Sequence, residues 1–227
     1  MTNPFIYPTE YFLQEGKENL ARCLKATFEA AAAHSIKKVI IFTSAGQGVK
    51  MAMQNYIAQE RFAEIKEIAV TFPSYTQFSA VDPSEQSIQS DMRKYLADHG
   101  VPIVQAHLPF DPIRSHYEGH GILGQDVSLI GNALRIFCGS MSLCVQAVLM
   151  ASDAGHVALG EHVIAMTSDT SILVRAAGTS RFLTDLIVRE IICKPVLLTI
   201  GKSEKAESIL EGPKETTPAI PELLPPE

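Results

Sequence analysis

The residues best suited to bind a small anion lie in one short segment, FTSAGQGVK, at positions 42–50. A continuous apolar run, Val39–Phe42, gives way there to two hydroxyl residues and two glycines before the next apolar-periodic segment. Glycines let the backbone turn tightly and approach an anion closely, and hydroxyl groups donate hydrogen bonds to it. The segment is therefore a candidate phosphate-binding loop, with Thr43, Ser44, Gly46, Gly48 and Lys50 as its candidate ligand residues.

Two interpretations of this loop stay open. It lacks the G-x-x-x-x-G-K-[ST] and G-x-G-x-x-G spacings of well-known phosphate loops. The same residues also fit an ordinary strand-to-helix turn in which Ser44 caps the helix and no ligand binds. In a ligand site, Lys50 would add a full positive charge from the first helical turn.

Further polar residues offer acid, base or clamp chemistry. Arg114 has two interpretations. It binds a phosphate or carboxylate through its planar guanidinium group, or it is a solvated arginine at the surface. Asp153 lies at a predicted helix end, where a negative charge is unfavourable, and this hints at a role. The neighbouring Gly155 is equally explained as an ordinary C-terminal cap. Together, Gln105, His107 and Asp153 would supply acid and base if they surround one ligand.

Metal and covalent chemistry are disfavoured. His116, Glu118 and His120 carry zinc-type ligand atoms, but the glycines between them work against the helix that would align the two histidines. The sequence contains no G-x-S-x-G motif, and no cysteine has the surroundings of a nucleophile. We therefore expect no metal site and no covalent intermediate.

The elements that must position these groups alternate in type along the first half of the chain. Near-continuous apolar strands separated by amphipathic helices predict an α/β fold with a mostly parallel sheet covered on both faces. In such sheets, ligands bind beyond the carboxyl ends of the strands, where the loop after Phe42 lies. The predicted strands are 38–42, 68–72 and 101–106, and the predicted helices are 16–34, 47–61 and 85–99, the last capped by Gly100.

The second half begins with a long connection, 107–125, of a length that often carries function. Two helices then follow, 126–138 and 140–154, broken at Gly139, and after them short strands at 163–166, 172–176 and 186–192. Residues 1–201 are predicted to form a single domain. Residues 202–227 are rich in proline and glutamate and are predicted to be a disordered tail.

Composition narrows the class of protein. The chain has 227 residues, 46% of them hydrophobic, and a net charge of −6 that is spread evenly, which excludes a nucleic-acid-binding surface. The longest uncharged run, Ile136–Ser152, is too short to span a membrane and predicts a buried helix. No signal peptide is visible, and the four cysteines lack C-x-x-C spacing. We expect a reduced, cytoplasmic protein.

Five segments carry a resemblance to a known family. They are GKENLARCL (16–24), IKKVIIFTSAGQGVKMA (36–52), ALRIFCGSMSLCVQAVLMASDAG (133–155), HVIAM (162–166) and REIICKP (189–195). Over most of residues 11–200 the chain resembles the free-standing pyruvate kinase C-terminal domain-like proteins. The resemblance implies a three-layer α/β/α sandwich with one reversed strand, and binding of a phosphorylated small molecule, with flavin mononucleotide (FMN) a candidate. It implies no reaction.

The resemblance also assigns residues, with two departures. Thr43, Ser44, Gly46 and Gln47 match the ligand loop of the family, whereas Gly48 stands where the family usually has threonine. After the HVIAM strand the family has a glycine-rich G-G-T-G-x-G-A-D segment, but this chain has a shorter one, residues 167–170. Thr167 and Ser168 are the candidate contacts there. The T-H motif of the third strand matches only as Ala106-His107, so His107 is the matching residue, and the loop after it diverges from the family. The departures imply weaker, different or absent binding.

Three functional hypotheses follow from the sequence. The first is a protein that binds a phosphate-bearing small molecule through residues 43–48. The second is an enzyme acting on a flavin or sugar phosphate, with His107, Arg114 and Asp153 around the same loop. The third is a structural or interaction module that has lost its ligand. The alanine-rich first helix and Arg135 also predict a homodimer as a candidate assembly.

Overall fold

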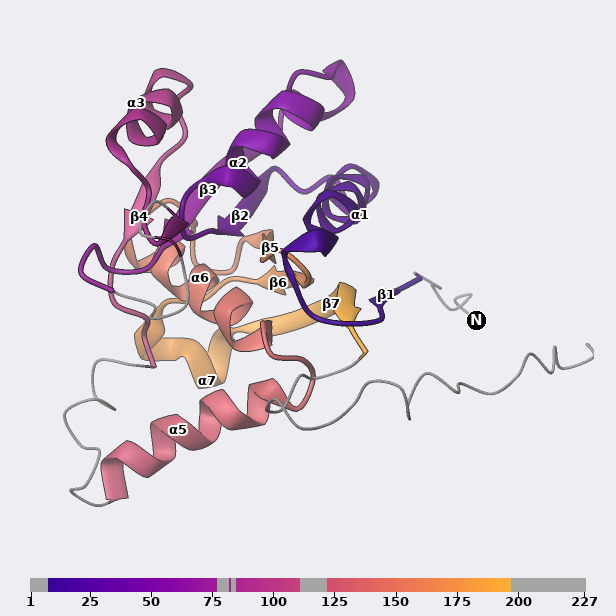
Figure 1. The fold of residues 1–227 in the computed structure, drawn as a ribbon. Helices are drawn as coiled ribbons and strands as arrows, with labels where there is room; N and C mark the ends of the chain where they lie inside the picture. The colour runs from indigo at the N-terminus through magenta and orange to yellow at the C-terminus, as the bar shows by residue number, and fades with distance from the viewer. Residues whose placement is uncertain (1–7, 77–81, 83–84, 111–121, 197–227) are drawn as a thin grey trace, which may run out of the picture.

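The computed structural model describes residues 8–76, 82, 85–110 and 122–196 (Figure 1). Within these residues a seven-stranded sheet has the order β1-β7-β6-β5-β2-β3-β4. Arg114, the metal-ligand candidates His116, Glu118 and His120, and the expected tail at 202–227 lie outside the described residues. The chain is an α/β protein, as the sequence predicts.

The sheet is mostly parallel, and β6 is the strand that runs against its neighbours β5 and β7. Strands β2, β3, β4 and β5 pair in parallel, and so do β1 and β7. One reversed strand in a mostly parallel sheet is the arrangement that the family resemblance implies. The strands are β1 (Glu10–Phe12), β2 (Lys38–Phe42), β3 (Lys66–Thr71), β4 (Ile103–Gln105), β5 (His162–Met166), β6 (Ser171–Arg175) and β7 (Ile187–Pro195).

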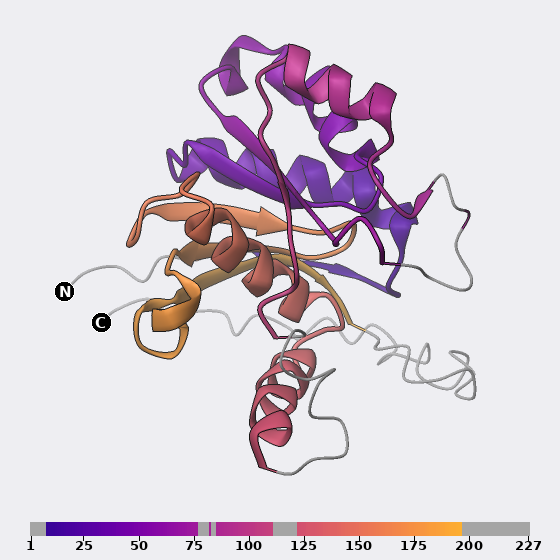
Figure 2. The same cartoon turned by 90° about the vertical axis from the view of Figure 1, so that its left-hand side faces the viewer.

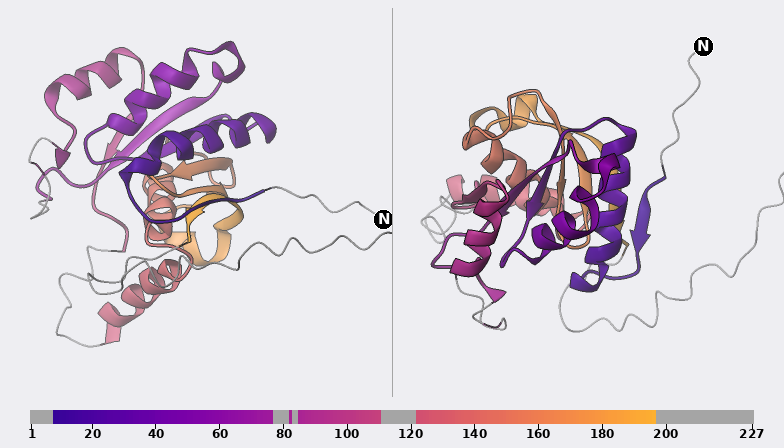
Figure 3. Two further views of the ribbon diagram at one scale, coloured as in Figure 1. Left: turned by 45° about the vertical axis from the view of Figure 1, so that its right-hand side comes forward. Right: turned by 90° about the horizontal axis from the view of Figure 1, so that it is seen from above.

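Helices cover both faces of the sheet, because successive strand residues alternate between two apolar cores. Val39 and Ile41 belong to the core beneath α1 (Leu20–Ala33), α2 (Gln47–Ala52) and α3 (Ser90–Asp98). Ile40 and Phe42 face the core beneath α6 (Met141–Asp153). Seen from above, the strands lie between α1 and α6 (Figure 3). The short α7 (Phe182–Asp185) adds Phe182 to the α6 side.

Helix α6 forms the centre of one core, whereas α5 (Ile122–Arg135) extends from it (Figure 2). The predicted buried helix is confirmed for α6, whose residues 144–151 are all buried. Arg135, which the sequence suggested as a residue of a homodimer interface, is exposed at the end of α5, a helix that packs on α6. Among the described residues, no helix combines the length and apolar character needed to cross a bilayer.

Local differences from the predicted elements have physical causes. The helix expected over 47–61 ends as a regular α-helix at Ala52, because residues 53–57 widen into a π-helical turn. In that turn the Ala58 amide donates to the carbonyl of Met53. The helix expected to begin at Glu85 begins at Ser90. Strand β1 and helix α7 are three and four residues long, too short to leave a periodic pattern in the sequence.

Candidate functional site

A pocket of about 440 Å³ opens at the carboxyl end of β2. Its wall combines the loop between β2 and α2 with the turn between β5 and β6. These two segments meet because β2 and β5 are parallel neighbours in the sheet. The lining residues are Lys17, Leu20, Ile41, Phe42, Thr43, Ser44, Gln47, Gly48, Phe72, Glu85, Ser140, Leu143, Thr167 and Ser168. The structure therefore brings six of the predicted ligand residues together: Thr43, Ser44, Gln47, Gly48, Thr167 and Ser168.

Residues 43–48, which we call the cradle loop, are held in place by three hydrogen bonds. The Thr43 amide donates to the carbonyl of Val70 at 2.9 Å, and the Thr71 hydroxyl donates to the carbonyl of Ser44 at 3.2 Å. The Gly46 amide donates to the hydroxyl oxygen of Thr43 at 3.0 Å. The loop is thus tied both to β3 and to itself, and its shape does not depend on a ligand.

Gly46, rather than Ser44, is the N-cap of α2. Its φ of +90° lies in the left-handed region that favours glycine, and a Cβ there would meet the Cγ of Met92 at 2.7 Å. The interpretation in which Ser44 caps the helix is therefore wrong. Gly46 does not line the pocket. Backbone geometry therefore explains why this position is a glycine.

The pocket is rich in polar groups that the protein leaves without partners. In the described part of the chain, the side chains of Ser44, Gln47, Ser140 and Ser168 have no hydrogen-bond partner. The backbone amides of Gln47 and Gly48, at the start of α2, likewise meet no protein acceptor among the described residues. These groups are free to bind water or a ligand.

The β5–β6 turn is organised by Asp169, a residue that the sequence analysis did not assign to the site. Its carboxylate is 3% exposed and accepts hydrogen bonds from the hydroxyls of Thr167 and Thr170 at 3.2 and 3.1 Å. It also accepts one from the Gly16 amide at 3.0 Å. Asp169 therefore connects the turn to the segment that carries Lys17 into the pocket wall. An aspartate between two threonines in a tight turn is the local signal that was available.

One ion pair supplies the charged groups of the pocket. The Nζ atom of Lys17 lies 3.5 Å from a carboxylate oxygen of Glu85, and both side chains are substantially exposed. Lys50, the expected cation, does not line the pocket. Its ammonium group lies 5.5 Å from the ring centroid of Tyr95 instead. The lysine that lines the pocket is therefore Lys17 and not the predicted Lys50.

The structure does not gather the proposed acid and base residues around the pocket. His107 follows β4, at the edge of the sheet, and its Nδ1 atom lies 3.2 Å from the hydroxyl of Tyr75. Asp153 ends α6, the helix whose first residues reach the pocket, so it lies at the far end of that helix. There its carboxylate accepts a hydrogen bond from the Thr179 amide at 3.0 Å, which offsets its unfavourable place at a helix end.

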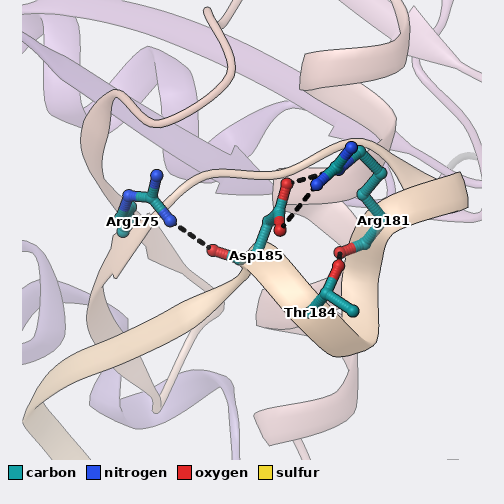
Figure 4. Close-up of polar contacts among 4 residues, drawn as sticks. All are labelled: Arg175, Arg181, Thr184 and Asp185. Atoms are coloured by element: carbon teal, nitrogen blue, oxygen red, sulfur yellow. Dashed lines mark hydrogen bonds and ion pairs between the residues drawn. The ribbon is translucent and has the colours of Figure 1, made fainter.

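A separate polar cluster lies between the end of β6 and α7 (Figure 4). Arg181 forms an ion pair with Asp185 at 2.6 Å, and Arg175 donates to the carbonyl of Asp185 at 3.0 Å. The hydrogen bond from Arg181 lowers the pKa of the Asp185 carboxyl. These contacts fasten α7 to the end of β6, a structural role that accounts for the side chains involved.

The four cysteines are free and buried, as predicted. Burial raises the pKa of the Cys23, Cys138 and Cys144 thiols, which keeps them protonated at neutral pH. A protonated, inaccessible thiol is a poor nucleophile. The cysteines therefore act as core residues.

Packing explains why position 48 is a glycine, where the resembled family usually has threonine. A Cβ on Gly48 would lie 3.3 Å from the Cγ2 of Ile41 and 3.6 Å from the Cδ1 of Leu20. We expect Gly48→Ala to change the free energy of unfolding by less than about 1 kcal/mol, since improved helix propensity offsets the tight contact. Gly48→Thr adds two more atoms and is expected to cost about 1–3 kcal/mol. Urea unfolding of both variants measures the difference, and equal stability of Gly48→Thr and wild type would contradict this packing account.

Within the described residues, no group of three or more histidine, cysteine, aspartate or glutamate side chains is placed to hold a metal ion. A search of the chain against models of known protein families finds no match.

Proposed function

We propose that the protein binds a phosphorylated small molecule in the pocket at the carboxyl end of β2. The observation that carries the proposal is a set of donors on residues that line the pocket and have no acceptor among the described residues: the Ser44 and Ser168 hydroxyls, the Gln47 side chain and the amides of Gln47 and Gly48. Convergent amide and hydroxyl donors at the end of a parallel strand suit the oxygens of a phosphate group.

The dimensions and the apolar part of the pocket favour a ligand larger than phosphate itself. Ligand pockets usually measure roughly 300–1,000 Å³, and this one measures about 440 Å³. Its apolar lining residues are Leu20, Ile41, Phe42, Phe72 and Leu143, and the two phenylalanine rings lie edge to face with their centroids 4.8 Å apart. FMN, with a phosphate, a hydroxylated chain and a flat ring system, is one candidate, and a sugar phosphate is another. The resemblance to pyruvate kinase C-terminal domain-like proteins favours the same class of ligand.

Binding is a better proposal than catalysis. An enzyme needs a group that moves a proton or forms a bond next to the ligand. His107 and Asp153, the predicted candidates for that work, do not line the pocket. The two ionisable lining residues, Lys17 and Glu85, pair with each other. We therefore propose a role in sensing or storing the ligand.

Ligand-induced stabilisation tests this proposal. Thermal unfolding is measured with inorganic phosphate, FMN, glucose 6-phosphate and AMP. A ligand present at a hundred times its dissociation constant is expected to stabilise the fold by about 2.7 kcal/mol. Flavin absorbance of the purified protein would show that a flavin is bound, and mass spectrometry of the released compound would identify it as FMN.

A matched pair of double variants locates the site. Ser44→Ala/Ser168→Ala is expected to weaken binding at least about tenfold, because two hydrogen bonds to a charged group are lost. Ser74→Ala/Ser180→Ala, which removes two exposed serines outside the pocket lining, is the control and is expected to bind like wild type. If no compound stabilises the wild type, or if both double variants bind equally well, the proposal fails.

A further inference from the structure

The charges around the pocket restrict the kind of phosphorylated ligand it suits. Lys17 and Glu85 are the ionisable residues among its lining residues, so the described wall has no net charge. The neighbouring cations have other partners: Lys50 lies over the Tyr95 ring, and the Arg93 guanidinium donates to the Ile88 carbonyl at 3.0 Å and to the Gln105 side chain. The described residues therefore offer the ligand one cation, Lys17.

Glu85 limits what that cation can do. A phosphate monoester carries a charge of about −1.5 to −2 at neutral pH, which a single lysine only partly balances. The carboxylate of Glu85, 3.5 Å from Lys17, competes for the lysine and repels any additional negative charge at the mouth of the pocket. A second phosphate on the same ligand would meet this repulsion, and the described lining residues include no second cation to offset it.

The remaining polar groups favour hydroxyls. Ser44, Gln47, Ser140 and Ser168 are neutral and both donate and accept hydrogen bonds. A carboxylate accepts hydrogen bonds from the hydroxyls of a sugar, as acidic residues do at ribose rings in nucleotide sites. Glu85 thus attracts a hydroxyl group and repels a phosphate at the same position.

We infer that the pocket selects a sugar-type ligand with a single phosphate over the same ligand with two, and that Glu85 is the residue that determines this specificity. The inference rests on the proposed function and names its ligand class. It assigns opposite roles to the paired residues: Lys17 pairs with the phosphate, and Glu85 excludes a second one.

The test compares glucose 6-phosphate with glucose 1,6-bisphosphate, two probes that differ by one phosphate. Wild type is expected to bind the monophosphate at least about tenfold more tightly at low ionic strength. In Glu85→Gln both probes are expected to bind more tightly, the bisphosphate by the larger factor, so the preference falls to about threefold or less. Isothermal titration calorimetry measures both affinities.

Glu64→Gln is the matched control. Glu64 is exposed and also pairs with a lysine, Lys37, but it lies outside this pocket, so the variant has the same net charge as Glu85→Gln. Its preference is expected to stay within about twofold of wild type, since distant exposed charges are screened. Because Glu85 is itself exposed at the surface, its replacement is expected to leave the fold intact.

The outcomes separate this inference from the proposed function. If wild type binds the bisphosphate as tightly as the monophosphate, or if Glu85→Gln keeps the full preference, the inference is overturned while phosphate binding stands. If wild type binds FMN but neither glucose phosphate nor AMP, the sugar-type ligand class is overturned and the proposed function survives. If none of these compounds binds, both fail.

Discussion

Glu67→Met is expected to stabilise the protein by about 3–5 kcal/mol at pH 8 and by much less at pH 4.5. Glu67 is on β3 and is 4% exposed, and neither carboxyl oxygen has a hydrogen-bond partner among the described residues. Burial raises the pKa of the Glu67 carboxyl to about 8. Methionine has a similar length and no polar group to bury, so it removes this cost.

The direction of the pH dependence follows from the raised pKa. Below pH 4.5 the carboxyl is protonated in both the folded and the unfolded protein, so its ionisation costs the fold nothing. Between pH 4.5 and about 8 the unfolded chain loses the proton while the folded protein keeps it, and wild-type stability falls as pH rises. Above pH 8 the carboxyl ionises in both states and the cost is constant, at most about 5 kcal/mol.

Urea unfolding at several pH values between 4.5 and 8.5 measures the effect. The difference in unfolding free energy between Glu67→Met and wild type is expected to widen from pH 4.5 to about 8 and then to level off. Glu60→Met, at an exposed position, is the control and is expected to show no such widening. A Glu67→Met curve that stays parallel to wild type would mean that Glu67 finds a partner or water in the folded protein.

Asp169→Ala is expected to lower the free energy of unfolding by about 3–5 kcal/mol and to abolish ligand binding. The substitution removes the acceptor of three hydrogen bonds, which the Gly16 amide and the hydroxyls of Thr167 and Thr170 donate. The Thr170 hydroxyl keeps only its contact with the Cys138 sulfur at 3.4 Å. Each unsatisfied buried donor costs about 1–3 kcal/mol, and neighbouring losses are not fully additive. Binding is lost because the turn and the segment before α1 are no longer held together.

Asp169→Asn separates the two effects, since its side-chain oxygen keeps an acceptor for part of this network. It is expected to be intermediate in stability, and its ligand-induced shift in melting temperature is expected to be reduced rather than absent. Hydrogen exchange at the Gly16 amide gives a local measurement, and it is expected to be faster in both variants. Unchanged stability of Asp169→Ala would show that Asp169 does not organise the turn.

The sequence predicted those parts of the fold and site that depend on neighbouring residues. The strand Lys38–Phe42 was predicted with its observed bounds because its apolar run is continuous and ends at hydroxyl residues and glycines. The cradle loop followed from that boundary. Ser168 was named through a family resemblance, and the structure places it on the same pocket as Ser44.

Contacts between distant residues were not predictable in this way. Gly16 and Asp169 are 153 positions apart, and neither carries a local pattern that points to the other. The pairing of Lys17 with Glu85 depends on how a loop before α3 folds back toward the start of α1. The prediction that Asp153 lies beside the ligand loop was wrong. The length of α6 carries Asp153 away from the pocket, and the aspartate-alanine-glycine sequence gives no information about that length.

The reversal of β6 determines how this site can change during evolution. A parallel strand after β5 would require a crossover helix, but β5 and β6 are joined by a hairpin of four residues, 167–170, whose tip forms one wall of the pocket. Insertions into a hairpin tip leave the register of the strands unchanged. Variation in the length of this tip is therefore expected to alter the size of the pocket without disturbing the sheet.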